Sequence, residues 1–140
     1  MKKIFLALLV ASSCLLSSCV KENIIFVESD SVKSFYIDAY RNHWIDNPDL
    51  TYIYATFAAP EITEKVIQNG IIVAYYIDND GRDNMLPYLL PYYDENIQDF
   101  YYENVRFDVS AGEITFIIED SDFNHANIPN KMKFKVAIAQ

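Results

Sequence analysis

Apolar and polar residues alternate with a period of two through most of the chain after Val32, and this alternation constrains the fold more than any other feature of the sequence. Side chains of a β-strand point alternately to opposite faces, so a period of two is typical of strands with one buried face. The clearest case is the final segment, in which Met132, Phe134, Val136 and Ile138 alternate with Lys131, Lys133 and Lys135. The chain is therefore expected to be mainly β.

Other segments repeat this alternation and are expected to be strands: residues 32–40, 50–58, 101–109 and 113–119. Residues 71–77 are apolar on both faces, which predicts a central strand that is covered on both sides. Lysines on one face of a strand discourage its pairing with another molecule. The three lysines of the final segment therefore predict an edge strand.

One short segment has helical spacing instead. Pro60 opens it, and Gly70 is placed to end it. Ile62, Val66 and Ile67 are spaced to share one face of this helix. About seven strands and one short helix predict an antiparallel β-sandwich of the immunoglobulin-like kind. A small lipocalin-like β-barrel is the alternative.

Length and composition narrow the class of protein. With 140 residues, the chain has room for one domain. Its residues are 51% hydrophobic and 15% aromatic, which excludes intrinsic disorder. The formal net charge of −9 would repel a polyanion, so no nucleic-acid partner is expected.

The first residues differ from the rest and predict a signal peptide. Lys2 and Lys3 precede an apolar run at residues 4–10, which is too short to span a bilayer. Leu16-Ser17-Ser18-Cys19 resembles the bacterial lipobox. This resemblance implies a lipid on the sulfur of Cys19 and cleavage just before it. An ordinary secretory leader is the alternative.

This interpretation divides the chain into a lipoprotein signal peptide (1–18), a lipidated cysteine with a tether (19–31) and a β-sandwich domain (32–140). The pair Lys21-Glu22 resembles the surface-export signals of Bacteroidota lipoproteins. We therefore expect a cell-envelope protein that is held on a membrane through Cys19, and we expect this membrane to be the outer membrane. Whether it faces the periplasm or the cell surface stays open.

A set of short motifs resembles small lipoproteins that are common in Bacteroidota. The motifs are Trp44, Tyr52-Ile53-Tyr54, Pro60-Glu61-Ile62-Thr63, the segment from Gly70 to Tyr76, Leu86-Pro87 and Phe134-Lys135-Val136. They cover most of the region after the tether. The resemblance implies the fold and the location, and it implies no activity.

Two acidic clusters are candidates for metal binding. Asp78 and Asp80 lie in a sequence that resembles part of a calcium loop, but the flanking acidic positions of such a loop are missing. The alternative is a hairpin turn, with positive φ angles at Asp80 and Gly81. Residues 119–122 with His125 mix carboxylates and an imidazole, and are otherwise expected to form a polar loop. No other cofactor is expected.

An aromatic cluster is the strongest candidate for a binding site. Its members are Tyr88, Tyr92, Tyr93, Phe100 and Tyr102. The alternation places Phe100 and Tyr102 on the outer face of their strand, and exposed aromatic patches often mark binding surfaces. Burial of these rings in the core is the alternative.

Three functions follow, in order of preference. The first is a non-enzymatic accessory or protein-interaction module of the cell envelope, which binds an envelope protein through the aromatic cluster. The second is a carbohydrate-binding module, with Tyr88, Tyr92 and Tyr102 stacking on the sugar rings of a glycan. The third is an enzyme that uses paired acids such as Asp94-Glu95 and Asp99.

Overall fold

The computed structural model describes residues 32–47, 52–95, 98–121 and 130–140. Its elements in chain order are β1 (Val32–Tyr40), a 3-10 helix η1 (Arg41–His43), β2 (Ile45–Asn47), β3 (Tyr52–Ala58), α2 (Glu64–Asn69), β4 (Ile71–Ile77), β5 (Asp83–Met85), β6 (Tyr88–Asp94), β7 (Asp99–Ser110), β8 (Glu113–Asp120) and β9 (Lys131–Ala139). The prediction of a mainly β chain with one short α-helix is confirmed. The lipobox, Cys19 and the tether lie outside the described residues.

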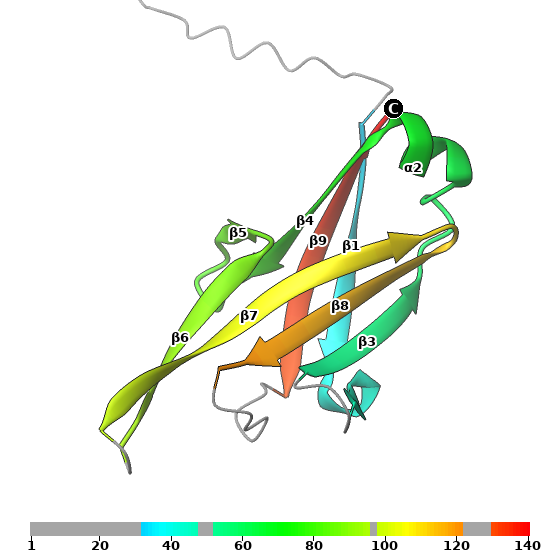
Figure 1. Ribbon diagram of the computed structural model, residues 1–140. Helices are drawn as coiled ribbons and strands as arrows, with labels where there is room; N and C mark the ends of the chain where they lie inside the picture. Colours follow the sequence, from blue (N-terminus) through cyan, green and yellow to red (C-terminus); the bar gives the residue numbers. More distant parts are fainter. Residues whose placement is uncertain (1–31, 48–51, 96–97, 122–129) are drawn as a thin grey trace, which may run out of the picture.

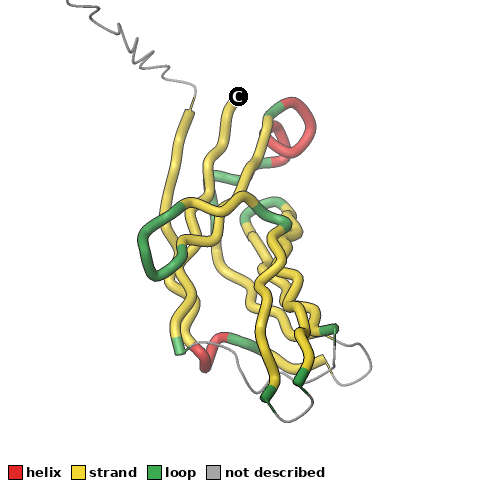
Figure 2. Tube along the Cα trace, turned by 90° about the vertical axis from the view of Figure 1, so that its left-hand side faces the viewer, coloured by secondary structure: helices red, strands yellow, loops and turns green. Residues whose placement is uncertain are grey.

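The strands form two antiparallel sheets that face each other as two layers (Figures 1 and 2). The four-stranded sheet has the order β1-β9-β4-β5, and the five-stranded sheet has the order β2-β3-β8-β7-β6. Among the described strands, no pairing joins one sheet to the other. The sheets therefore do not close, and the alternative of a lipocalin-like barrel is wrong.

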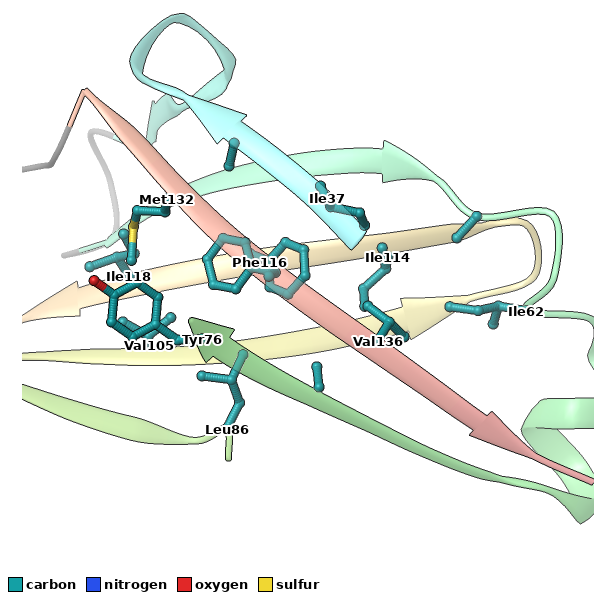
Figure 3. Close-up of a cluster of buried hydrophobic side chains, with 14 of the residues drawn as sticks. Ile37, Ile62, Tyr76, Leu86, Val105, Ile114, Phe116, Ile118, Met132 and Val136 are labelled. Atoms are coloured by element: carbon teal, nitrogen blue, oxygen red, sulfur yellow. The ribbon is translucent and has the colours of Figure 1, made fainter. Parts of the chain in front are cut away.

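The core lies between the sheets and consists of the side chains that the alternation places inward (Figure 3). At its centre, the rings of Phe116 on β8 and Phe134 on β9 stack with centroids 3.8 Å apart. Ile37 on β1, Ile53 on β3 and Val105 on β7 are also buried, as predicted. Burying such side chains stabilises the fold by about 1.5–3 kcal/mol each.

The final strand β9 is not an edge strand, and that prediction is wrong. β9 lies between β1 and β4, and it pairs with both along most of its length. Its lysines contact rings of these neighbours on the outer face: Lys131 lies over Tyr40, Lys133 over Tyr36 and Lys135 over Tyr75. Two of the lysines also form ion pairs, Lys131 with Asp38 and Lys135 with Asp83.

The strand β4 is covered on one face only, contrary to expectation. Ala74 and Tyr76 are buried in the core. On the opposite face, Ile71 is exposed and Tyr75 is half-buried. Lys135 of the neighbouring β9 lies over the Tyr75 ring, so this outer face is covered only in part, by a side chain of the same sheet.

The helix α2 begins later than Pro60. The Thr63 hydroxyl accepts a hydrogen bond from the Val66 backbone N–H and caps the helix at Glu64. Val66 is buried as predicted, whereas Ile67 is exposed. Gly70 ends the helix as its C-cap. Only a glycine fits this position, because a Cβ atom there would lie 2.7 Å from the Val66 carbonyl oxygen and 2.8 Å from that of Ala139.

Candidate functional site

The predicted aromatic cluster lies on the β6–β7 hairpin, which extends past the rest of the sandwich (Figure 1). The register places Tyr92 opposite Tyr101, and Tyr93 opposite Phe100. Because side chains alternate along each strand, these two neighbouring pairs point to opposite faces of the hairpin. The structure therefore divides the cluster into two sets.

The outer set forms an exposed surface, which we name the hairpin patch: Leu89, Pro91, Tyr93, Phe100 and Tyr102. Leu89, Tyr93, Phe100 and Tyr102 keep between 47% and 59% of their surface exposed. The rings of Tyr93 and Phe100 meet edge to face, with centroids 5.1 Å apart. The prediction that Phe100 and Tyr102 face outward is confirmed.

Backbone contacts fix one end of the hairpin patch. The Tyr102 N–H donates to the Ser121 hydroxyl at 2.9 Å, and the Ser121 N–H donates to the Tyr102 carbonyl at 3.0 Å. These two bonds continue the pairing of β7 with the end of β8. The aromatic side chains are thus displayed from a hydrogen-bonded strand, which limits the entropy that they would lose on binding.

The inner set packs against the sandwich. Tyr92 stacks on Tyr101, with centroids 5.2 Å apart and ring planes 16° apart. Tyr88 contacts Tyr76 of β4, with centroids 6.4 Å apart. Tyr88 and Tyr92 are both half-buried, so their rings contribute to packing. The two cluster members Tyr88 and Tyr92 therefore lie on the opposite face from Tyr102, and no single glycan could stack on all three.

Two buried carboxylates lie beside the inner set, and the sequence interpretation predicted the burial of neither. Glu103 is 0% exposed and Asp120 is 5% exposed, and the register places them opposite each other on β7 and β8. Burial, the negative charge of Glu103 and a hydrogen bond with Glu103 together raise the pKa of Tyr92. Glu103 lies two residues from both Tyr101 and Val105, which were predicted to face inward. This spacing was the sequence signal that could have predicted its burial.

The acidic segment at residues 119–122 is only partly a loop. Glu119 and Asp120 are the last residues of β8. On the outer face, the Arg106 Nε atom donates to Glu119 at 3.0 Å, and the Asn104 amide donates to the same carboxylate at 3.3 Å. Asp122 and His125 lie outside the described residues, so the idea of a metal site with them stays a prediction.

The candidate calcium residues form a hairpin turn between β4 and β5. One Asp78 oxygen accepts from the backbone N–H groups of Asp80 and Arg82, at 3.0 and 2.8 Å, and the other accepts from the Asn84 amide. These hydrogen bonds lower the pKa of Asp78. Of the two residues expected to have a positive φ, only Gly81 does, at 79°. Asp80 pairs with Arg82 at 3.3 Å.

This geometry gives the Asp78 carboxylate a structural task within the turn, and calcium would have to compete with it. Binding of calcium by Asp78 and Asp80 stays a prediction. A melting temperature that rises in calcium, falls again in EDTA, and does neither in Asp80→Asn would support it.

The paired acids that were considered for catalysis lie at the tip of the hairpin. Asp94 and Asp99 are opposite each other in the register. Asp99 is exposed, and it accepts a hydrogen bond from the Phe100 backbone N–H at 2.8 Å.

Two hollows of the structure lie away from these acids: one of about 680 Å³ beside α2, and one of about 350 Å³ on the outer face of the five-stranded sheet.

Within the part of the chain that the structure describes, no group of three or more His, Cys, Asp or Glu residues is arranged to hold a metal ion. In the same residues, no helix has the length and apolar character needed to cross a membrane. No family model, curated protein or solved structure was found to match the chain.

Proposed function

We propose that this chain is a lipid-anchored protein of the bacterial cell envelope, similar to small Bacteroidota lipoproteins, which acts without catalysis by binding a partner protein. Its sandwich is of the immunoglobulin-like kind, and the binding surface is the hairpin patch. The observation that carries the proposal is the exposure of five apolar side chains on one face of a hairpin. Contiguous exposed apolar surface often marks a protein interface.

The position of the hairpin patch relative to the chain ends supports this proposal. Val32 pairs with Ala139, and both lie at the end of the sandwich where α2 is found. The tip of the β6–β7 hairpin lies at the opposite end in both views (Figures 1 and 2). With Cys19 in a membrane, residues 20–31 could span at most about 40 Å. The domain would then stay near the bilayer, with the hairpin at the end of the sandwich that is farther from the point of attachment.

The chemistry of the hairpin patch favours a protein over a glycan. Leu89 and Pro91 lie among the rings of Tyr93, Phe100 and Tyr102. Aliphatic and aromatic side chains together are typical of the centre of protein interfaces, where charged residues are depleted. The Tyr93 and Phe100 rings meet at 61°, so they offer no flat platform for consecutive sugar rings.

Site-specific photocrosslinking in cells that produce the protein tests this proposal. A benzophenone amino acid replaces Phe100 in one variant and Tyr36 in another. Both positions are 59% exposed, but Tyr36 lies on the outer face of the four-stranded sheet. We expect one discrete protein adduct from position 100 and none from position 36.

A second substitution shows whether the adduct depends on the hairpin patch. Adding Tyr102→Asp to the position-100 variant places a charge in the patch and should remove the adduct. The same adduct from position 36, no adduct from position 100, or an adduct only with a second copy of this chain would each contradict the proposal.

The anchor is tested separately by growth with an alkyne analogue of palmitate. The sequence has one other cysteine, Cys14, which serves as the control. We expect the wild-type chain and Cys14→Ala to carry the label, and Cys19→Ala to lose it. Because stable membrane attachment needs two acyl signals, the Cys19→Ala chain should also no longer sediment with membranes. A Cys19→Ala chain that is still labelled and still sediments with membranes would contradict lipidation at Cys19.

A further inference from the structure

The outer face of the five-stranded sheet is hollowed at a place away from the hairpin patch. A groove of about 350 Å³ is bounded by residues of β2, β3, β7 and β8. We propose that this groove, which we name the β3 groove, binds a neutral saccharide such as a disaccharide or the end of a glycan chain. Its volume is at the low end of the ~300–1,000 Å³ that is typical of small-molecule sites.

The apolar part of the β3 groove is built by two tyrosines and an isoleucine. Tyr52 and Tyr54 are two residues apart on β3 and therefore project from the same face. Their ring centroids are 6.3 Å apart, and the ring planes are inclined by 62°. Ile117 is the register partner of Tyr54 and is only 5% exposed, although it points to the outer face.

This shape fits one sugar ring better than a long chain. The C–H groups on one face of a pyranose form an apolar surface that packs against an aromatic ring, while the hydroxyl of a tyrosine stays available to polar groups. Two rings inclined to each other beside a nearly buried isoleucine offer a single unit two apolar surfaces of different orientation. Coplanar rings would instead support consecutive units of an extended glycan.

The polar part of the β3 groove is held in place by its own hydrogen bonds. The Asn47 amide donates to the Tyr52 hydroxyl at 3.1 Å. One nitrogen of Arg106 donates to both oxygens of Asp108, at 3.2 and 3.1 Å. The hydroxyls of Thr56 and Thr115 are 2.9 Å apart and bond to each other.

These bonds orient the polar groups and leave them with capacity for a ligand. The Asn47 carbonyl oxygen can still accept, and a carboxylate such as Asp108 has about four acceptor positions. Sugar hydroxyls are both donors and acceptors, so they match a lining of amide, carboxylate and hydroxyl groups. A few fixed polar groups beside apolar surface are typical of specific small-molecule sites.

Charge decides which saccharide fits. Among the described residues that line the β3 groove there is one carboxylate, Asp108, and no basic side chain. The nearby Arg106 is paired with Asp108 and Glu119. The whole chain has a net charge of −9. Uronic, phosphorylated or sulfated sugars would therefore be repelled, and a neutral saccharide is favoured.

Saturation-transfer NMR and calorimetry test this inference, with the protein as cells produce it, extracted in detergent. The detergent must lack a sugar headgroup, because a glycoside detergent would compete for the groove. The probes are cellobiose, maltose, lactose and N,N′-diacetylchitobiose, with digalacturonic acid as the anionic comparison. We expect at least one neutral disaccharide to bind and digalacturonic acid not to bind.

Matched variants show where on the protein the saccharide binds. Tyr54→Ala should weaken it at least tenfold, and Asn47→Ala and Asp108→Asn should weaken it at least threefold. Tyr36→Ala, on the other sheet, and Phe100→Ala, in the hairpin patch, should leave it within twofold. The two polar variants keep the test valid if Tyr54→Ala does not fold.

Three results would overturn the inference: no neutral disaccharide binds at millimolar concentration, digalacturonic acid binds equally well, or binding survives all three groove variants. Loss of binding in Phe100→Ala alone would move the sugar to the hairpin patch and contradict the proposed function as well. Failure of the photocrosslinking experiment alone would leave the β3 groove unaffected, so the two proposals fail separately.

Discussion

The two faces of the β6–β7 hairpin carry similar side chains in different surroundings. On the inner face, Tyr92 stacks on Tyr101, which is only 4% exposed. On the outer face, the next pair along, Tyr93 and Phe100, makes a ring contact of nearly the same length. Both of its rings are more than half exposed. The contact between the rings is therefore not what separates a structural pair from a candidate binding pair.

The residues around each ring pair distinguish the inner pair from the outer pair. The inner pair lies beside the buried carboxylates Glu103 and Asp120, while the outer pair lies beside exposed Leu89 and Tyr102. Aromatic residues on the inner face hold the hairpin on the sandwich, and those on the outer face remain available to a partner. Substitutions on the two faces should therefore affect different properties of the protein.

The largest expected difference is in stability between Tyr101→Ala and Phe100→Ala. Removing the buried ring of Tyr101 should lower the free energy of unfolding by about 3 kcal/mol or more, because it leaves a cavity. Removing the exposed ring of Phe100 should change it by no more than about 0.5 kcal/mol. Urea unfolding followed by circular dichroism measures both. Equal losses would show that the inner face is not the structural one.

The next contrast compares two glutamates, the buried Glu103 of the inner face and Glu119 of the outer face. Glu103→Ala should lower the free energy of unfolding by about 1–3 kcal/mol, because Tyr92 loses a buried hydrogen-bond partner. Glu119→Ala, on the outer face, breaks a partly exposed ion pair with Arg106 and should cost less than about 1 kcal/mol. The same urea experiment compares them, and a larger loss for Glu119→Ala would contradict this assignment of faces.

The alternation of residues predicted which side of each strand faces the core, because that property depends only on local sequence. It placed Ile37, Phe116 and Phe134 inward, and Phe100 and Tyr102 outward, in agreement with the structure. It could not predict which strands are neighbours. The strand β9 is central because it pairs with both β1 and β4, and these pairings join residues that are far apart in the sequence.

The burial of the two carboxylates and the presence of the β3 groove were not predicted, for two different reasons. The alternation along β7 places Glu103 on the inward face. An acidic residue is nevertheless expected at the surface, because a buried charge needs partners that the sequence does not reveal. The β3 groove joins four strands, and Tyr54 meets Ile117 only through the register of β3 with β8. The split of the aromatic cluster likewise depends on the register of β6 with β7.

The pH dependence of stability offers a smaller contrast. Burial and Glu103 raise the pKa of Tyr92, so the native state keeps this proton after the unfolded chain loses it near pH 10. The native state then binds more protons, and stability falls as the pH rises above 10, by up to about 1.4 kcal/mol per pH unit. Tyr92→Phe should reduce this fall between pH 9 and 11, measured by urea unfolding. Tyr93→Phe is the matched control, and an equal reduction in both would contradict the prediction.

The smallest expected effect on stability is also the one that links the outer face to function. Leu89→Ser and Tyr93→Ser remove exposed apolar surface, so they should change the free energy of unfolding by no more than about 0.5 kcal/mol. If the hairpin patch binds a partner, each should nevertheless reduce the crosslinked adduct from position 100 by at least fivefold, because exposed anchors contribute to an interface and not to the core. Melting curves of the variants and quantified adducts from the same cells measure the two effects. A variant that keeps both its stability and its adduct would show that the exposed rings have no role in binding, and one that loses its stability would show that the outer face belongs to the fold.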